Sequence, residues 1–191
     1  MPHDQPPESV TVTSPPWLDE VVDWERRHDG TESRMRVAIA LARENVLRDG
    51  GGPFGAAIFE RDSGRIVAAG VNRVQQLDNC ALHGEMVAVM LANARVGSYT
   101  LDAPGLPAHE LVTSCEPCAM CLGATLWSGV RRLVFGALRA DASAVGFDEG
   151  PVFPESHAYL RDRGIEIVGG ILREDARAVL ELYVERGGRV Y

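Results

Sequence analysis

No run of apolar residues in this chain is long enough to cross a bilayer, and residues 1–30 lack the apolar core and cleavage site of a secretory signal. Cysteine is also scarce: four are present, and three of them, Cys115, Cys118 and Cys121, fall within seven residues. This spacing suits metal ligation better than a disulfide framework. We therefore expect a cytoplasmic protein with no membrane partner.

Basic residues are fewer than acidic ones. The chain has 19 lysine and arginine residues against 27 acidic residues, and its formal net charge of −8 repels a phosphate backbone. The charge argues against a nucleic-acid partner, although Arg131, Arg132 and Arg139 leave a local basic groove open as an alternative. With 191 residues, 46% of them hydrophobic, the chain suits one compact domain.

Residues 1–30 differ in composition from the rest of the chain. Five of the first 16 residues are prolines, which exclude a sustained helix and leave little to bury. Trp17, Val21 and Trp24 then recur at helical spacing, with Ser14 as a candidate N-cap, and predict a short amphipathic helix. We expect an N-terminal extension over 1–30 and a folded domain over 31–191.

The remaining chain predicts alternating helices and strands. The expected helices cover 31–48, 83–96, 118–128 and 174–185, and the expected strands cover 54–60, 65–72, 111–113, 132–136 and 164–168. The first two strands flank a turn and predict a hairpin. The glycines at 50–52 lack the Lys-Ser/Thr ending of a phosphate loop and predict a turn after the first of these helices. This order favours an α/β sandwich with a mixed sheet.

Two short fragments carry residues suited to metal chemistry. His83-Gly84-Glu85 and Pro117-Cys118-Ala119-Met120-Cys121 together form the pattern H-x-E…P-C-x-x-C. Cysteines at positions i and i+3 at the start of a helix point toward one ion, and the helix N-terminus favours their thiolates. His83 supplies a third ligand. The pattern therefore predicts a zinc ion with its fourth position open to water.

Glu85 follows His83 by two residues and is expected beside the metal without being a ligand. There it can take a proton from water, pass it to a ring nitrogen of the substrate and then protonate the departing amine. Zinc lowers the pKa of bound water to about 7, so that hydroxide can attack the carbon that bears the amino group. The expected reaction is a hydrolytic deamination.

Three other interpretations fit part of this pattern. A closed structural zinc site would use Cys115 as a fourth ligand, and a thioredoxin-like redox pair would use only the C-x-x-C, but neither gives Glu85 a role. A zinc-stabilised binding module that inherited the site is the non-enzymatic alternative. Cys80 and Cys115 are expected to be small buried residues without a catalytic role.

From about residue 31 onward the chain resembles the cytidine deaminase-like superfamily and, within it, the bacterial guanine deaminases. The resemblance lies in Pro53-Phe54-Gly55-Ala56, in the run 113–124 and in Gly146-Phe147-Asp148-Glu149. It implies a three-layer α-β-α sandwich with a five-stranded mixed sheet, one Zn²⁺ ion per subunit, and a homodimer that often exchanges its C-terminal segment. The implied reaction converts guanine, a small nucleobase, and water into xanthine and ammonia.

The same resemblance assigns further residues to the site. Glu149 stands where the family carries an acidic residue that assists proton shuttling, and Asn72 where an asparagine binds the polar edge of the base. Substrate contacts are also implied for Phe54, Gly84, Trp127 (often contributed across the dimer) and Tyr191 in the closing C-terminal tail. Gly84 replaces the usual alanine, as in fungal cytosine deaminases. We expect it to leave the pocket floor less filled, so cytosine, or a related aminopurine or triazine, is an alternative substrate. A tRNA wobble adenosine is another, which the net charge disfavours.

Overall fold

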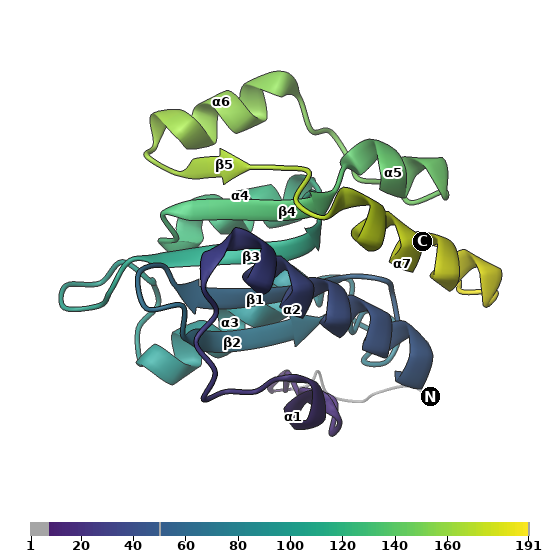
Figure 1. Ribbon diagram of the computed structural model, residues 1–191, viewed down its shortest axis with the longest axis horizontal. Helices are drawn as coiled ribbons and strands as arrows, with labels where there is room; N and C mark the ends of the chain where they lie inside the picture. Colours follow the sequence, from purple (N-terminus) through teal and green to yellow (C-terminus); the bar gives the residue numbers. More distant parts are fainter. Residues whose placement is uncertain (1–7, 50, 191) are drawn as a thin grey trace.

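The computed structural model describes residues 8–49 and 51–190, and helices and strands alternate along most of the chain (Figure 1). Within these residues no helix is both long and apolar enough to span a membrane. Every helix and strand predicted from the sequence is present, and the helices over Arg139–Ala144 and Pro154–Asp162 are additional. The strands are β1 (Gly55–Glu60), β2 (Ile66–Val71), β3 (His109–Cys115), β4 (Arg132–Ala137) and β5 (Glu166–Val168). The helices are α1 (Leu18–Val21), α2 (Gly30–Glu44), α3 (Gly84–Val96), α4 (Ala119–Ser128), α5 (Arg139–Ala144), α6 (Pro154–Asp162) and α7 (Arg173–Glu185), with a π-helical turn at Asn45–Asp49.

The five strands form one mixed sheet in the order β2-β1-β3-β4-β5. Strand β1 is antiparallel to β2 and β3, whereas β3, β4 and β5 run parallel. In this register Ala57 lies between Ala69 on β2 and Val112 on β3. The turn between β1 and β2 contains Gly64, whose φ of +66° is a left-handed conformation that glycine adopts without strain. The predicted hairpin and mixed sheet are confirmed.

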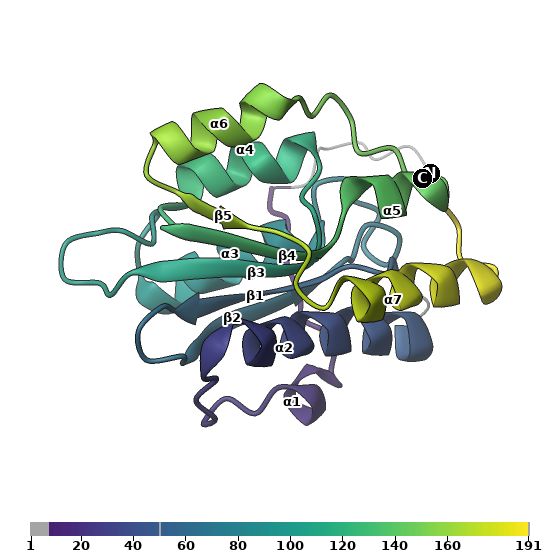
Figure 2. The same ribbon diagram turned by 45° about the horizontal axis from the view of Figure 1, so that its top comes forward.

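Side chains alternate along β1 and divide the core between the two faces of the sheet. Ala56 and Ile58 belong to one buried cluster with residues of α3, α4 and α6, while Ala57 and Phe59 belong to another with residues of α1 and α2. Figure 2 shows the layers: α4 and α6 lie on one side of the sheet, and α1, α2 and α7 on the other. The predicted three-layer sandwich is confirmed.

Two local predictions differ from the structure, and two observed helices have no counterpart among the predicted elements. The α-helical part of α2 ends at Glu44, and the chain continues as a π-helical turn in which Asn45 is fully buried. Ser14 is not the N-cap of α1, because that helix has only four residues and its N-cap is Trp17. Helices α5 and α6 have six and nine residues, too few turns for the apolar period to stand out in the sequence.

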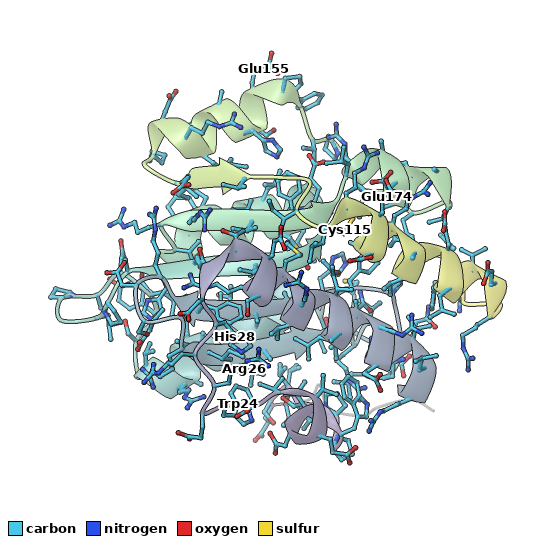
Figure 3. All side chains as sticks on the ribbon, viewed as in Figure 1. Trp24, Arg26, His28, Cys115, Glu155 and Glu174 are labelled. Carbon is cyan, nitrogen blue, oxygen red and sulfur yellow. The ribbon has the colours of Figure 1, made fainter. Side chains whose placement is uncertain are left out.

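The N-terminal segment packs on the domain. Trp17 and Leu18 are buried in the same cluster as Met35 of α2. Trp24, labelled at the edge of the fold in Figure 3, stacks with Arg95 of α3, whose guanidinium carbon lies 5.4 Å from its ring centroid. From Trp17 onward this extension therefore contributes to the core.

Two glycines allow the helices around the site to approach the sheet closely. A Cβ on Gly70 of β2 would lie 2.4 Å from the carbonyl oxygen of Gly84 in α3, and a Cβ on Gly55 of β1 would lie 2.5 Å from that of Ala38 in α2. Any larger residue at these positions would push the helix away from the strand. The start of α3 is thereby held against the end of β2, next to Asn72.

Candidate functional site

The predicted metal ligands meet where α3 and α4 begin, beyond the carboxyl end of β3. His83 is the N-cap of α3, Cys118 is the N-cap of α4, and Cys121 follows in the first turn of α4. The His83 Nδ1 lies 3.5 Å from Cys118 Sγ and 3.6 Å from Cys121 Sγ. Among residues 8–49 and 51–190, these three side chains form the one group of His, Cys, Asp and Glu residues close enough to share a metal ion.

The donor set fits zinc. With Zn–S bonds of about 2.3 Å and Zn–N bonds of about 2.1 Å, tetrahedral geometry puts a sulfur and a nitrogen ligand about 3.6 Å apart. The observed distances of 3.5 Å and 3.6 Å match that separation. One imidazole and two thiolates also suit zinc better than magnesium or calcium. Three protein ligands leave a fourth position open.

The three ligands share protons as a coupled group. A hydrogen bond from the Cys121 thiol lowers the pKa of Cys118 to about 4; burial opposes this shift, and a weaker contribution from the His83 ring adds to it. The same hydrogen bond, together with burial, raises the pKa of Cys121. Burial opposes protonation of His83, but its hydrogen bond with Cys118 and the charge of Glu85 together raise its pKa. A thiolate beside an imidazole is ready to accept a cation.

Glu85 lies in the first turn of α3 and is 6% exposed. Burial raises the pKa of its carboxyl, and the negative charge of Cys118 adds to the shift. A hydrogen bond with the Cys121 side chain ties this carboxyl to the ligand group. Glu85 therefore stands beside the metal ligands with a carboxyl suited to accept and return a proton.

A cavity of about 90 Å³ adjoins these groups. It brings Phe54, Asn72 and Glu149, which come from three distant parts of the sequence, together with Glu85. Its full lining consists of Phe54, Asn72, His83, Glu85, Cys115, Glu116, Cys118, Phe147, Asp148 and Glu149.

Phe147 is a site residue that sequence reasoning did not single out. Its ring centroid lies 4.9 Å from that of Phe54 in an edge-to-face arrangement and 5.9 Å from that of Tyr183 on α7 in a stacked one. Three aromatic rings thus support one another on one side of the cavity. Phe147 lies in a loop without periodicity, so its only signal was its position two residues before Glu149.

Asn72 and Glu149 are held by backbone contacts. Asn72 is 1% exposed, and its N–H donates to the Phe54 carbonyl oxygen at 3.0 Å. The carbonyl oxygen of Glu149 accepts a hydrogen bond from the Ala119 N–H at 3.0 Å, which ties its loop to the start of α4. Burial raises the pKa of the Glu149 carboxyl to about 8, and the charges of Cys118 and Glu85 contribute. Backbone hydrogen bonds therefore hold both residues in the segments that form the cavity wall.

The two other cysteines lie outside the ligand group. Cys115 is inside the fold at the end of β3 (Figure 3), where its thiol contacts the Leu138 carbonyl oxygen at 3.9 Å. Burial raises the pKa of Cys115 well above its usual range. The arrangement does not support Cys115 as a fourth zinc ligand. Cys80 is exposed, so the prediction that it is buried is wrong.

Two of the remaining predicted substrate contacts, Gly84 and Trp127, do not line the cavity. Gly84 is buried at the start of α3, and a Cβ there would lie 3.2 Å from the Phe54 carbonyl oxygen, so a methyl group would point at backbone rather than into the cavity. Trp127 lies on the outer face of α4, 77% exposed, and does not line the cavity of its own chain. Tyr191 lies outside the described residues.

A mixed sheet with His, Cys and Cys ligands at two helix N-termini, beside a buried glutamate, defines the zinc-dependent class of nucleobase deaminases. Comparison with known proteins makes the assignment more specific. The profile of the cytidine and deoxycytidylate deaminase zinc-binding region matches residues 29–137. The chain is 37% identical over 134 residues to the guanine deaminase of Bacillus subtilis, covering 70% of this chain and 81% of that protein. It belongs to the cytidine and deoxycytidylate deaminase family.

Solved structures agree with this assignment. The guanine deaminase from Nitrosomonas europaea is 45% identical, with a TM-score of 0.88 over 94% of this chain and 98% of that one. A structure of NE0047 in complex with 2,6-diaminopurine is 46% identical, with a TM-score of 0.89 over 95% of both chains. The fold and family expected from the sequence motifs are confirmed.

Proposed function

We propose that the protein is a guanine deaminase, which converts guanine and water into xanthine and ammonia. The observation that carries this proposal is the buried Glu85 carboxyl beside the metal-ligand group, in the wall of a cavity that also contains Asn72 and Glu149. The guanine deaminases at 37% and 45% identity support the choice of guanine, and the purine bound to NE0047 supports a bicyclic base.

One zinc ion per subunit would be held by His83, Cys118 and Cys121. Bound zinc would supply hydroxide near neutral pH, because it acts as a Lewis acid on water. The chain holds the two thiol ligands at the N-terminus of α4, where the helix dipole favours their ionised form. Thiol ligands need a reducing compartment, which supports a cytoplasmic location.

Glu85 moves the protons. Its carboxylate accepts one proton from the attacking water and passes it to a ring nitrogen next to the amino-bearing carbon. It then accepts the second proton of that water, from the hydroxyl of the tetrahedral adduct, and gives it to the amine as it leaves. The oxygen of water remains on the carbon and the amine departs as ammonia, so the atoms balance. The raised pKa of Glu85 supports this role, because a carboxyl that holds its proton more firmly is a better acceptor.

The cavity suits a free base. Asn72 would hold the polar edge of guanine, Phe54 would pack against it, and Glu149 would assist proton transfer at the far side of the purine. The volume of about 90 Å³ lies below the range of about 300–1,000 Å³ typical of drug-sized ligands. Glu116 and Asp148 add to the carboxyl groups in the wall, which repel phosphate. These features support a nucleobase over a nucleotide or tRNA.

Ammonia release from the purified, zinc-loaded protein tests this function. Guanine, cytosine, adenine and ammeline are offered separately to wild type and to Glu85→Gln, which keeps the side-chain volume but cannot carry the proton. We expect turnover of guanine, lowered about 10²–10⁴-fold in the variant while zinc content stays unchanged. Turnover of cytosine without guanine would overturn the substrate and keep the mechanism. Full activity in Glu85→Gln would overturn the mechanism.

We also propose that the protein is a homodimer formed through α4. Met120 and Trp127 are 38% and 77% exposed on this helix, beside an apolar groove that includes Leu122 and Leu126. Exposed aromatic and methionine side chains are enriched in protein interfaces. A second copy on this face would cover Trp127 and could bring it to the partner's cavity.

Light scattering on wild type and Trp127→Glu tests the dimer. We expect twice the chain mass for wild type and the monomer mass for the variant, because a charge replaces the exposed indole. A monomeric wild type would contradict the proposal. Exchange of the C-terminal segment between the two copies stays a separate prediction. In the single chain, the Arg189 carbonyl oxygen accepts hydrogen bonds from the Tyr183 hydroxyl at 2.7 Å and from Gln75 Nε2 at 2.9 Å.

A further inference from the structure

Asn45 is the first residue of the π-helical turn that follows α2, and it is fully buried. Its Nδ2 donates one hydrogen bond to the carbonyl oxygen of Gly52 and another to the carbonyl oxygen of Asn72, both at 2.9 Å. One side-chain amide therefore joins the end of α2, the turn before β1 and the residue after β2.

Both carbonyl groups belong to segments that carry cavity residues. Phe54 follows Gly52 by two residues, and its carbonyl oxygen accepts the Asn72 N–H at 3.0 Å. The backbone of Asn72 is thus held at its N–H by Phe54 and at its carbonyl by Asn45. The Asn72 Oδ1 also accepts the Val74 N–H at 3.2 Å. Asn45 therefore supplies one of the backbone contacts that hold the residue whose side chain lines the cavity.

The side chain at position 45 has to donate at both contacts. Its two partners are carbonyl oxygens, which only accept hydrogen bonds, so an amide nitrogen fits and a carboxylate oxygen would be repelled. Asn45 itself does not line the cavity. Any effect it has on a bound base must pass through its neighbours, chiefly Asn72.

Gly51 leaves the space that this side chain needs. A Cβ on Gly51 would lie 2.5 Å from Asn45 Nδ2 and 2.9 Å from its Cγ. Because two hydrogen bonds hold the amide, it could not move aside without losing them. The glycine-rich segment at 50–52, which the sequence predicts as a turn, therefore also needs a glycine at position 51 for the Asn45 side chain to fit.

We propose that Asn45 is a positioning residue that sets how tightly the enzyme binds its base, by fixing Asn72. This inference rests on the proposed function, in which Asn72 holds the polar edge of the base. Loss of the Asn45 contacts weakens binding of the base equally in the ground state and the transition state. The Michaelis constant KM therefore rises while kcat is retained.

Steady-state kinetics with guanine on the zinc-loaded Asn45→Asp and Asn45→Ala variants test the inference. We expect KM to rise about tenfold or more, with kcat within about threefold of wild type and zinc content unchanged. Gly51→Ala should raise KM in the same direction, because it displaces the amide without removing it. The matched control is Asn93→Ala, which removes an amide hydrogen bond of 3.3 Å to the Tyr99 carbonyl oxygen near the end of α3. It should leave KM unchanged.

The outcomes separate a positioning role from a structural one. A KM within about twofold of wild type in both Asn45 variants overturns the inference. A loss of kcat at unchanged KM, in proportion to the folded or zinc-loaded fraction, also overturns it. If neither Asn45 variant folds, Gly51→Ala supplies the measurement. If wild type deaminates another base, the proposed function fails and the same KM comparison is made with that base.

Discussion

Alanine at position 84 would add one methyl group to the first residue of α3, beside the cavity but not in its wall. The new Cβ would lie 3.2 Å from the Phe54 carbonyl oxygen, 3.5 Å from its carbonyl carbon and 3.6 Å from the Asn72 backbone nitrogen. The last two are ordinary contacts, whereas the first is shorter than the separation of about 3.5 Å at which non-bonded atoms attract. The methyl group therefore packs on backbone and not on the substrate.

Two opposing contributions set the stability of Gly84→Ala. Alanine favours a helix over glycine by up to about 1 kcal/mol, because it restricts the unfolded chain more. The tight contact with Phe54 costs about 1 kcal/mol, at the low end of the range of about 1–3 kcal/mol for overfilling a core. Because these nearly cancel, we expect the free energy of unfolding to change by less than about 1 kcal/mol.

Denaturant unfolding and kcat/KM for guanine and cytosine check both parts of this prediction. Since the methyl group does not reach the base, the guanine-to-cytosine ratio of kcat/KM should change by less than about threefold. A shift of that ratio by more than about tenfold would show that the residue at position 84 contacts the base. A methyl group that packs only on backbone would not produce such a shift.

Three further predictions concern the ligand group, the cavity and a buried ion pair on the central strand β3. Cys118→Ser should lower zinc content in atomic absorption because it weakens one of three ligands, whereas Cys115→Ala should retain it because that thiol lies outside the group. In zinc-free protein, burial raises the pKa of Glu149 to about 8, above the value of about 4.3 in the unfolded chain. Its protonation therefore contributes fully to stability below about pH 4.3, and this contribution is lost as pH rises through about 8. The Glu149→Gln variant does not titrate at this position, so in thermal unfolding its stability should fall less than that of wild type between about pH 5 and pH 8. Equal losses of stability in the two proteins would contradict this prediction. Arg34→Ala should lower the free energy of unfolding in urea by about 3 kcal/mol, because the fully buried Glu110 loses a partner at 2.6 Å; a change below about 1 kcal/mol would contradict it.

Local patterns were sufficient for most of the fold. Strand β1 alternates between the two faces of the sheet, as a period of two requires, and the hairpin closes through a glycine at Gly64. The two missed helices, α5 and α6, are too short for periodicity, although Pro154 at the start of α6 is a helix signal that could have revealed it. No local sequence pattern predicted the π-helical turn that begins at Asn45, because the hydrogen bonds of the Asn45 side chain are to carbonyl groups at Gly52 and Asn72, outside the helix.

The sequence by itself determined the candidate metal-ligand set. Cys118 and Cys121 lie three residues apart at the start of one helix, and the proximity of Glu85 to His83 follows from their places on another. Helical geometry sets the relative positions of residues on one helix, so these positions can be predicted without knowing the tertiary structure.

The tertiary structure decided which distant residues join that set. Only the packing of α3 and α4 at one end of the sheet brings His83 Nδ1 to 3.5 Å from Cys118 Sγ, and only loop packing adds Phe147 to the cavity. The tertiary structure also leaves Trp127 exposed on the surface and brings the Asn45 side chain into hydrogen-bond contact with the Asn72 carbonyl oxygen. Contacts between residues far apart in the chain depend on how whole elements pack, and no local pattern records that arrangement.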